Sequence, residues 1–214
     1  MSSKFSRRNF IGLSLAGLGL ALFSGKALGA DSHAAQSAPK KPLVVYFSHS
    51  GNTRKVAEMI HNKVGGDIIE IRPVESYPDE YNKLTELAKK EQQAGARPAV
   101  QPESVDLAQY DVIFLGYPNW WSSMPMPVYT FIEKNKLDGK TVAPFATHGG
   151  GGLGHSVEDL KKLAPHSRIL KPFSVSGTAA GRAEKDVLRW LEGLGQALIE
   201  TTTGNTKIYP DGGY

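Results

Sequence analysis

The sequence predicts a doubly wound α/β fold in which helices cover both faces of a five-stranded parallel sheet with the strand order 2-1-3-4-5. Two observations support this prediction. Short apolar runs rich in β-branched residues alternate along the chain with segments whose apolar residues recur at helical spacing. These runs contain few polar residues, which is typical of parallel strands that are buried on both faces.

The first half of the fold is predicted to hold two strands and two helices. Residues 43–47 form an apolar run that ends at a Ser/Gly cluster and is interpreted as the first strand. From residue 53 onward the apolar residues fall on one helical face, and Gly65-Gly66 ends this helix. Residues 68–71 give the second strand, and the apolar residues between 79 and 94 mark the second helix.

The second half is predicted to hold three strands and three helices. The strands are residues 112–115, 141–146 and 169–175. Pro144 lies inside the middle run and cannot donate a ladder hydrogen bond there. Pro127 opens one helix, Ser156 and Asp159 form a capping-box-like start of the next, and residues 187–194 carry the apolar face of the last.

The first 30 residues have the composition of an export signal. Arg7-Arg8 precede a polar residue and Phe10-Ile11, an apolar stretch covers residues 12–23, and small residues follow at 27–30. This arrangement resembles a twin-arginine signal, which a receptor reads as an address. An uncleaved membrane anchor and a cytoplasmic amphipathic N-terminus are the alternatives, but the apolar stretch is shorter than the about 20 residues that span a bilayer.

These features divide the chain into four expected parts. They are an export signal at 1–30, a polar tether at 31–41, a folded domain at 42–198 and a tail at 199–214. We therefore expect a periplasmic or otherwise extracytoplasmic protein that keeps no stable membrane span once the signal is removed. The sequence leaves its oligomeric state open.

Charge and composition exclude several functions. The net charge of +4 comes from the four basic residues of the signal, because the rest of the chain has as many Lys and Arg as the 21 Asp and Glu. We therefore expect no nucleic-acid partner. The chain has no cysteine and none of its six histidines has a metal-ligand spacing, so we expect no metal site.

Polar residues follow the first strand and lead directly into a helix. They are Ser48, His49, Ser50, Gly51, Asn52 and Thr53. Hydroxyl groups and backbone N–H groups at a helix N-terminus form a site for an anion such as a phosphate monoester. The alternative is that Asn52 or Thr53 only caps the helix.

Two further loops follow the third and fourth strands. The first contains Pro118, Asn119, Trp120 and Trp121, and the second contains Thr147, His148, Gly149, Gly150 and Gly154. Two adjacent tryptophans at a strand exit suit stacking on a planar ring, unless one is a core residue and the other is partly exposed. The glycines allow the backbone to approach a flat ligand, unless they form a flexible loop without a ligand. In this topology all three loops lie at one edge, beside the crevice between the first and third strands.

Three segments carry a resemblance to a known family. They read YFSHSGNTRKVAE, DVIFLGYPNWWSSMPMPVYTF and THGGGGLGHSVEDLKKL, and together with their surroundings they cover residues 42–195. The sequence resembles the flavodoxin family, whose members have a three-layer α/β/α sandwich and bind FMN.

The resemblance implies roles for individual residues. Ser48, Ser50, Asn52 and Thr53 would hold the FMN phosphate. Pro118, Asn119, Trp120 and Trp121 would line one side of the isoalloxazine, and Thr147, His148 and Gly149 would line the other. The family pattern implies that His49 contributes through its backbone, and it does not say which tryptophan stacks on the ring.

The leading hypothesis is an exported FMN protein that carries electrons to or from a redox partner protein. Such transfer needs no general acid or base, so no catalytic residue is assigned. One alternative is an FMN-dependent reductase of a quinone-like small acceptor, and another is a non-redox binding module without flavin. The sequence therefore leaves open whether the protein is an enzyme.

Overall fold

A computed structural model describes residues 41–202 of the protein. The predicted export signal, nearly all of the predicted tether and the chain beyond residue 202 therefore lie outside the described residues. The last helix continues to residue 202, past residue 198 at which the sequence places the end of the domain. None of the described helices is long and apolar enough to cross a membrane.

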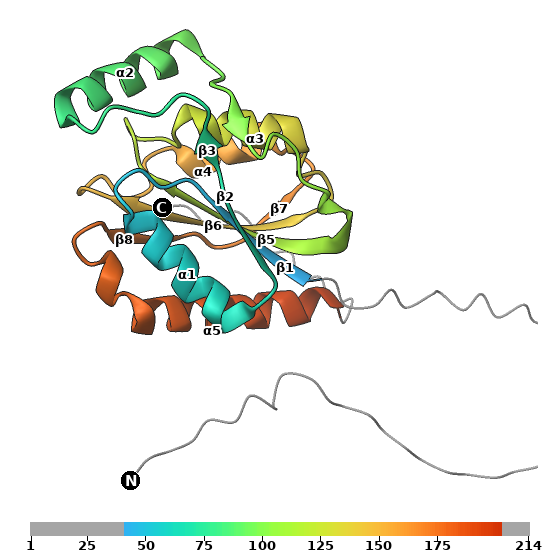
Figure 1. The fold of residues 1–214 in the computed structure, drawn as a ribbon. Coiled ribbons are helices and arrows are strands. Elements are labelled where there is room, and N and C mark those ends of the chain that lie inside the picture. Colours follow the sequence, from blue (N-terminus) through green and yellow to red (C-terminus); the bar gives the residue numbers. More distant parts are fainter. Residues whose placement is uncertain (1–40, 203–214) are drawn as a thin grey trace, which may run out of the picture. The chain divides into compact units, whose positions relative to one another are not determined.

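The main sheet confirms the predicted parallel topology (Figure 1). Its strands are β1 (Lys41–Tyr46), β2 (Asp67–Glu70), β5 (Tyr110–Pro118), β6 (Thr141–His148), β7 (Arg168–Ile169) and β8 (Phe173–Ser176). They lie in the order β2-β1-β5-β6-β7, and β8 also pairs with β6. This is the predicted order 2-1-3-4-5, with the fifth strand divided into β7 and β8.

The division of the fifth strand is explained by a proline in its neighbour. Val142 of β6 accepts a hydrogen bond from Leu170 N, on the side of β7. Residues two apart in a strand direct their backbone groups to the same side, so Pro144 faces the same neighbour. Because proline has no N–H, Pro144 cannot donate a hydrogen bond to the neighbouring strand. Pro144 lies between the part of β6 that pairs with β7 and the part that pairs with β8.

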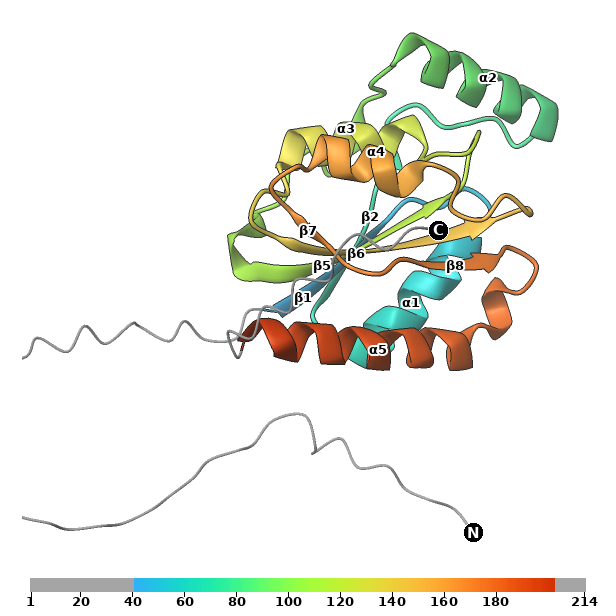
Figure 2. The ribbon, with the colours of Figure 1, turned by 180° about the vertical axis from the view of Figure 1, so that it is seen from behind.

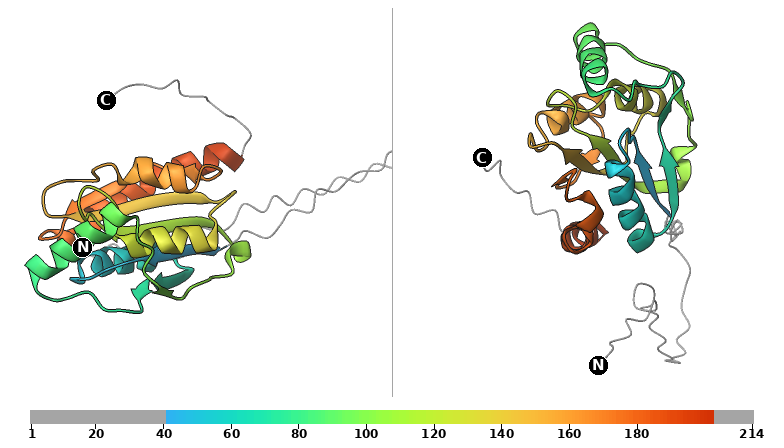
Figure 3. Two further views of the ribbon diagram at one scale, coloured as in Figure 1. Left: turned by 90° about the horizontal axis from the view of Figure 1, so that it is seen from above. Right: turned by 60° about the vertical axis from the view of Figure 1, so that its left-hand side comes forward.

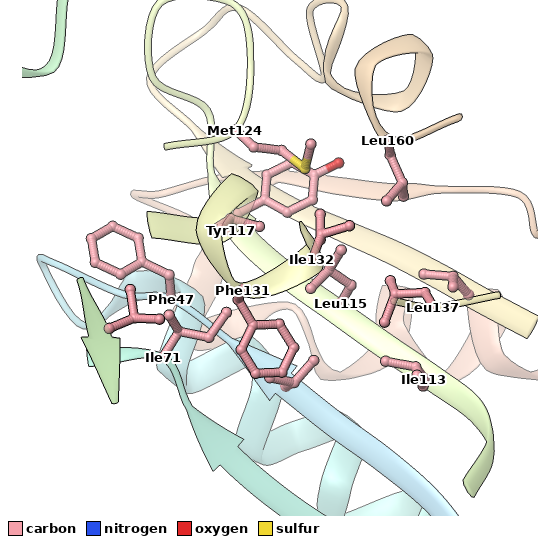
Figure 4. Packing of buried hydrophobic residues seen from close by; sticks show 14 of the residues in the cluster. Phe47, Ile71, Ile113, Leu115, Tyr117, Met124, Phe131, Ile132, Leu137 and Leu160 are labelled. Carbon is pink, nitrogen blue, oxygen red and sulfur yellow. The ribbon is translucent and has the colours of Figure 1, made fainter. Parts of the chain in front are cut away.

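Two pairs of helices cover the two faces of the sheet (Figures 1 and 2). Helices α1 (Asn52–Val64) and α5 (Glu184–Thr202) cover one face, and α3 (Met126–Asn135) and α4 (Ser156–Leu163) cover the other. β1 alternates between them, since Leu43 and Val45 belong to the core under α3 and α4, and Val44 belongs to the core under α1 and α5. Figure 4 shows the first of these cores, in which Phe131 and Tyr117 are fully buried.

Helix α2 (Tyr81–Ala94) lies outside these layers, beyond α3 (Figures 1 and 3). The segment that carries α2 leaves and re-enters the domain through two short antiparallel strands, β3 (Arg72–Pro73) and β4 (Val100–Gln101). The sequence predicts α2 but not this two-stranded base. Two short 3-10 helices, η1 (Leu107–Gln109) and η2 (Ala180–Arg182), complete the described elements.

The predicted capping box of α4 is wrong. The residue that precedes the helix is His155, and no side chain caps its N-terminus. The Ser156 hydroxyl instead donates to Leu153 O at 2.7 Å and accepts from the Tyr117 hydroxyl at 3.1 Å. Ser156 is fully buried, so its hydroxyl serves the contact between β5 and α4.

Candidate functional site

A crevice of about 950 Å³ lies at the carboxyl edge of the sheet. Residues from all three predicted loops line it, together with residues from two segments that the sequence analysis did not single out. From the predicted loops these are His49, Ser50, Asn52, Pro118, Asn119, Trp120, Trp121, Thr147, His148 and Gly149. From the other two segments they are Asp79, Tyr81, Leu84, Thr85 and Ala88, and Ser176, Gly177 and Thr178.

Hydrogen bonds join the three predicted loops to one another. The buried hydroxyls of Thr53 and Thr147 lie 2.9 Å apart and connect the start of α1 to the end of β6. Asn119 N donates to Thr147 O at 2.7 Å, and its side chain donates to Gly152 O at 2.7 Å. The convergence that the topology predicts is therefore built from direct contacts between the loops.

The first loop presents unpaired donors at the N-terminus of α1. Gly51 precedes the helix with a φ of 81°, no side chain caps the helix, and its first turn contains no acidic residue. Neither Asn52 nor Thr53 acts as the cap that the alternative interpretation required. The Ser48 hydroxyl oxygen is buried and has no hydrogen-bond partner within residues 41–202. These groups are suited to bind an anion.

The loop after β5 is a tight turn with a left-handed backbone. Trp121 and Ser122 have φ values of 50° and 65°, a conformation that costs about 1–3 kcal/mol for each residue other than glycine. Two backbone bonds close the turn, from Trp120 N to Ser123 O at 2.9 Å and from Ser123 N to Trp120 O at 3.1 Å. We call residues 120–123 the tryptophan turn.

The two tryptophans of this turn have different surroundings. Trp120 is half-buried and packs edge-on against Phe47, Tyr77 and His49, with ring centroids 5.3, 5.1 and 6.0 Å away. Trp121 is 45 % exposed. Trp121 is partly exposed, as the alternative expects, but Trp120 packs at the edge of the core rather than within it, and both residues line the crevice.

Trp121 connects the tryptophan turn to α2, which forms an additional wall of the crevice. Its indole N–H donates to Thr85 O at 2.9 Å, and its backbone carbonyl accepts from the Gln92 side chain at 3.2 Å. The Lys89 ammonium lies 4.8 Å from the centroid of the indole. Nothing in the local sequence of α2 indicates this role, because it depends on where the β3–β4 base places the helix.

The glycines of the loop after β6 have two different roles, lining the crevice and packing against the tryptophan turn. Gly149 lines the crevice, but Gly150 and Gly154 do not. A Cβ atom on Gly154 would lie 2.1 Å from Ser122 O, so this glycine allows close packing against the tryptophan turn. His148 Nδ1 accepts a hydrogen bond from Gly150 N at 3.1 Å, which leaves its proton on Nε2, where it can be donated to a ligand.

Ser48, Gly51 and Thr53 are not among the residues that line the crevice. Thr53 is committed to Thr147, whereas the Ser48 hydroxyl remains available. The loop after β8 was missed although its Ser-Gly-Thr composition resembles that of the first loop. Gly177 packs closely on Asn52, since a Cβ atom there would lie 2.8 Å from Asn52 Nδ2.

The crevice contains little charge. Among residues 41–202, Asp79 is the only carboxylate in its lining, and no Lys or Arg side chain of this part of the chain lines it. Burial, together with a hydrogen bond to Glu91, raises the pKa of Tyr77, so this phenol behind Trp120 is neutral. Across residues 41–202 no cluster of three or more His, Cys, Asp or Glu side chains could hold a metal ion. The lining therefore suits a ligand that is recognised mainly by stacking and backbone hydrogen bonds.

Comparison with known proteins places the chain in a family. The family model described as Flavodoxin matches residues 41–194, and no match was found among curated proteins. A candidate flavoprotein from Bacteroides uniformis is 30 % identical with a TM-score of 0.65, over 72 % of this chain and 99 % of that one. A candidate flavoprotein from Bacteroides eggerthii is 36 % identical with a TM-score of 0.62, over 72 % and 96 % of the two chains.

A third structure is a flavoprotein from Lactobacillus acidophilus in complex with FMN. It is 25 % identical with a TM-score of 0.54, and the match covers 63 % of this chain and 93 % of that one. The family match spans every strand of the main sheet and all the loops around the crevice. This chain therefore belongs to the flavodoxin family.

Proposed function

We propose that this protein is an exported FMN protein that carries electrons, with the cofactor held in the crevice at the carboxyl edge of the sheet. The observation that carries the proposal is the unpaired, buried Ser48 hydroxyl beside the uncapped N-terminus of α1. A phosphate monoester accepts hydrogen bonds from both and gains from the helix dipole. The relative from Lactobacillus acidophilus, solved with FMN, supports this choice of ligand.

The residues around the rest of the crevice fit a flat ring. Trp120 and Trp121 provide aromatic surface in the lining, and His148 and Gly149 provide polar groups there. FMN supplies the electron-transfer chemistry when it is bound. The protein's own residues orient the ring, exclude water from one side of it and hold a proton on His148 Nε2.

The cofactor prediction is tested on the full chain, purified with its native N-terminus. We expect flavin absorbance in the purified protein or after FMN is added. The Ser48→Ala variant should bind FMN about tenfold more weakly, because hydrogen bonds to charged groups contribute about 1.5–3 kcal/mol. Its affinity for riboflavin, which lacks the phosphate, should be unchanged. A colourless protein that does not bind added FMN would contradict the proposal and favour a non-redox binding module.

Export is tested by cell fractionation. We expect the protein in the periplasm with its signal removed, and we expect replacement of both Arg7 and Arg8 by lysine to retain it in the cytoplasm, because the twin-arginine receptor reads the arginine pair. The matched control replaces Lys4 and Lys26 by glutamine, which removes two positive charges and keeps the pair. Recovery of the intact protein in the membrane fraction would instead support an uncleaved anchor.

The α2 wall favours a second candidate function, the reduction of a small acceptor. Leu84, Ala88 and Tyr81 add apolar and aromatic surface, and the crevice of about 950 Å³ is at the upper end of the ~300–1,000 Å³ that ligand pockets occupy. Without Lys or Arg in its lining, it suits a neutral planar molecule such as a quinone. Saturable reoxidation of the reduced protein by a neutral naphthoquinone, and much slower reoxidation by its sulfonate, would support this function over protein-to-protein transfer.

A further inference from the structure

We propose that Asp159 is a positioning residue that fixes the tryptophan turn from behind and thereby determines how tightly the crevice holds its cofactor. Asp159 lies on α4 and does not line the crevice. Its effect on cofactor binding rests on the proposed FMN site, whereas its effect on the turn does not.

One carboxylate oxygen of Asp159 accepts hydrogen bonds from three different elements. Oδ2 lies 2.6 Å from Ser123 Oγ, 2.8 Å from the Tyr129 hydroxyl and 2.6 Å from His155 Nδ1. The Ser123 and Tyr129 hydroxyls are themselves 2.8 Å apart. The tryptophan turn, α3 and the start of α4 are therefore joined at a single, largely buried atom.

The carboxylate is ionised in this arrangement. Burial alone would raise the pKa of Asp159, but hydrogen bonds from Ser123, Tyr129 and His155 outweigh burial and lower it. An ionised carboxylate accepts hydrogen bonds more strongly than a neutral group does. The contact with Ser123 is therefore a charge-assisted hydrogen bond to the turn.

The turn needs such a contact because its backbone is strained. Trp121 and Ser122 are both left-handed, and a strained conformation persists only where its surroundings hold it. Backbone bonds close the turn between Trp120 and Ser123 and join Ser122 to His155, and the Asp159 carboxylate binds the hydroxyl of the fully buried Ser123. A shift of Ser123 would move both indoles and the contact between Trp121 and α2.

The experiment uses two variants of Asp159 and a matched control. Asp159→Ala removes the acceptor, and Asp159→Asn keeps one acceptor oxygen and removes the charge. Glu158→Gln removes the same charge from the same first turn of α4, but Glu158 is exposed. Tyr129→Phe removes one donor and leaves Asp159 in place, so it provides a milder test if the Asp159 variants do not fold.

The first readout is the near-ultraviolet circular dichroism and tryptophan emission of the apoprotein, and the second is the Kd for FMN. We expect both tryptophan signals to change in the Asp159 variants and, to a smaller extent, in Tyr129→Phe. The Kd for FMN should rise tenfold or more in the Asp159 variants, and Glu158→Gln should resemble the wild type in every measurement.

The outcomes separate the two proposals. If the wild-type protein does not bind FMN, the cofactor proposal is contradicted. If the Asp159 variants of that protein still change the tryptophan signals, the positioning of the turn by Asp159 is supported. Unchanged signals and an unchanged Kd in folded Asp159 variants would overturn the role of Asp159. The same result would follow if Glu158→Gln changed both readouts as strongly as the Asp159 variants.

Discussion

Substitution of Asn52 by aspartate should weaken FMN binding by about two orders of magnitude while it stabilises the apoprotein. Asn52 begins α1 and lines the crevice beside the predicted phosphate position. Two unit charges about 4 Å apart repel by about 4 kcal/mol at an effective dielectric constant of about 20, which is roughly a thousandfold in Kd. Solvent at the open crevice reduces this repulsion, so about a hundredfold is expected.

The effect on stability should have the opposite sign. The first turn of α1 contains no acidic residue, and a carboxylate there interacts favourably with the helix dipole by about 0.3–1 kcal/mol. Isothermal titration with FMN measures the affinity, and urea unfolding of the apoprotein measures the stability.

A matched control uses the other end of the same helix. Asn62→Asp introduces the same charge at an exposed position in the last turns of α1, where it should slightly destabilise the apoprotein and leave the Kd for FMN unchanged. Wild-type FMN affinity in Asn52→Asp would show that the phosphate does not lie at this helix N-terminus, and the proposed orientation of the cofactor would be wrong.

The sequence predicts the fold well because the alternation of apolar strand runs with helical periodicity is repeated along the chain. Each buried strand is a short apolar run, and α1, α2 and α3 each begin or end at a glycine or proline whose effect on the backbone is local. Once the strands are parallel, their carboxyl ends must share one edge, so topology alone predicts that residues 48–53, 117–121 and 147–154 lie there. No knowledge of side-chain packing is needed for this step. Within the last segment only Thr147, His148 and Gly149 are among the residues that line the crevice.

Where the prediction fails, the cause lies in tertiary contacts. The sequence predicts that the Ser156 hydroxyl caps a helix, but Tyr117 and Leu153 provide its partners. The wall formed by α2 depends on the contact between Trp121 and Thr85, which are 36 residues apart. Periodicity identifies α2 as a helix but contains no information about the surface against which it packs.

The glycine-rich loop shows that one residue type can serve two purposes within a few positions. Gly149 leaves space in the crevice, whereas Gly154 leaves space for Ser122 in the tryptophan turn. The sequence motif contains both glycines, and only the atoms that surround each Cα distinguish their roles. Substitution of each glycine by alanine should therefore have different consequences, and the largest effect on the folded state is expected at Gly154.

Gly154→Ala should destabilise the apoprotein by about 2 kcal/mol or more, through a left-handed backbone and a steric overlap that cannot be relieved by a side-chain rotation. Gly154 has a φ of 56°, and the added methyl group would lie 2.1 Å from Ser122 O and 2.7 Å from its Cα. Backbone must therefore move on one side of the contact. The hydrogen bond from His155 N to Ser122 O, 2.7 Å long, should weaken with it.

The control for this substitution lies two residues earlier. Gly152 has a φ of 57°, nearly the same as Gly154, but nothing lies within 4 Å of a Cβ atom there. Gly152→Ala therefore includes the cost of the left-handed backbone, about 1 kcal/mol, without the overlap. The difference between the two variants in thermal unfolding isolates the contact with the tryptophan turn.

The same pair of variants connects this contact to function. If the left-handed turn must present Trp120 and Trp121 in one arrangement, Gly154→Ala should change the tryptophan emission and lower the affinity for FMN at least tenfold, and Gly152→Ala should change neither. Equal losses of stability and affinity in the two variants would mean that backbone freedom, and not close packing on Ser122, is the reason for glycine at position 154. The tryptophan turn would then not depend on close packing of the loop after β6, and its backbone bonds, its contact with α2 and the Asp159 carboxylate would hold it.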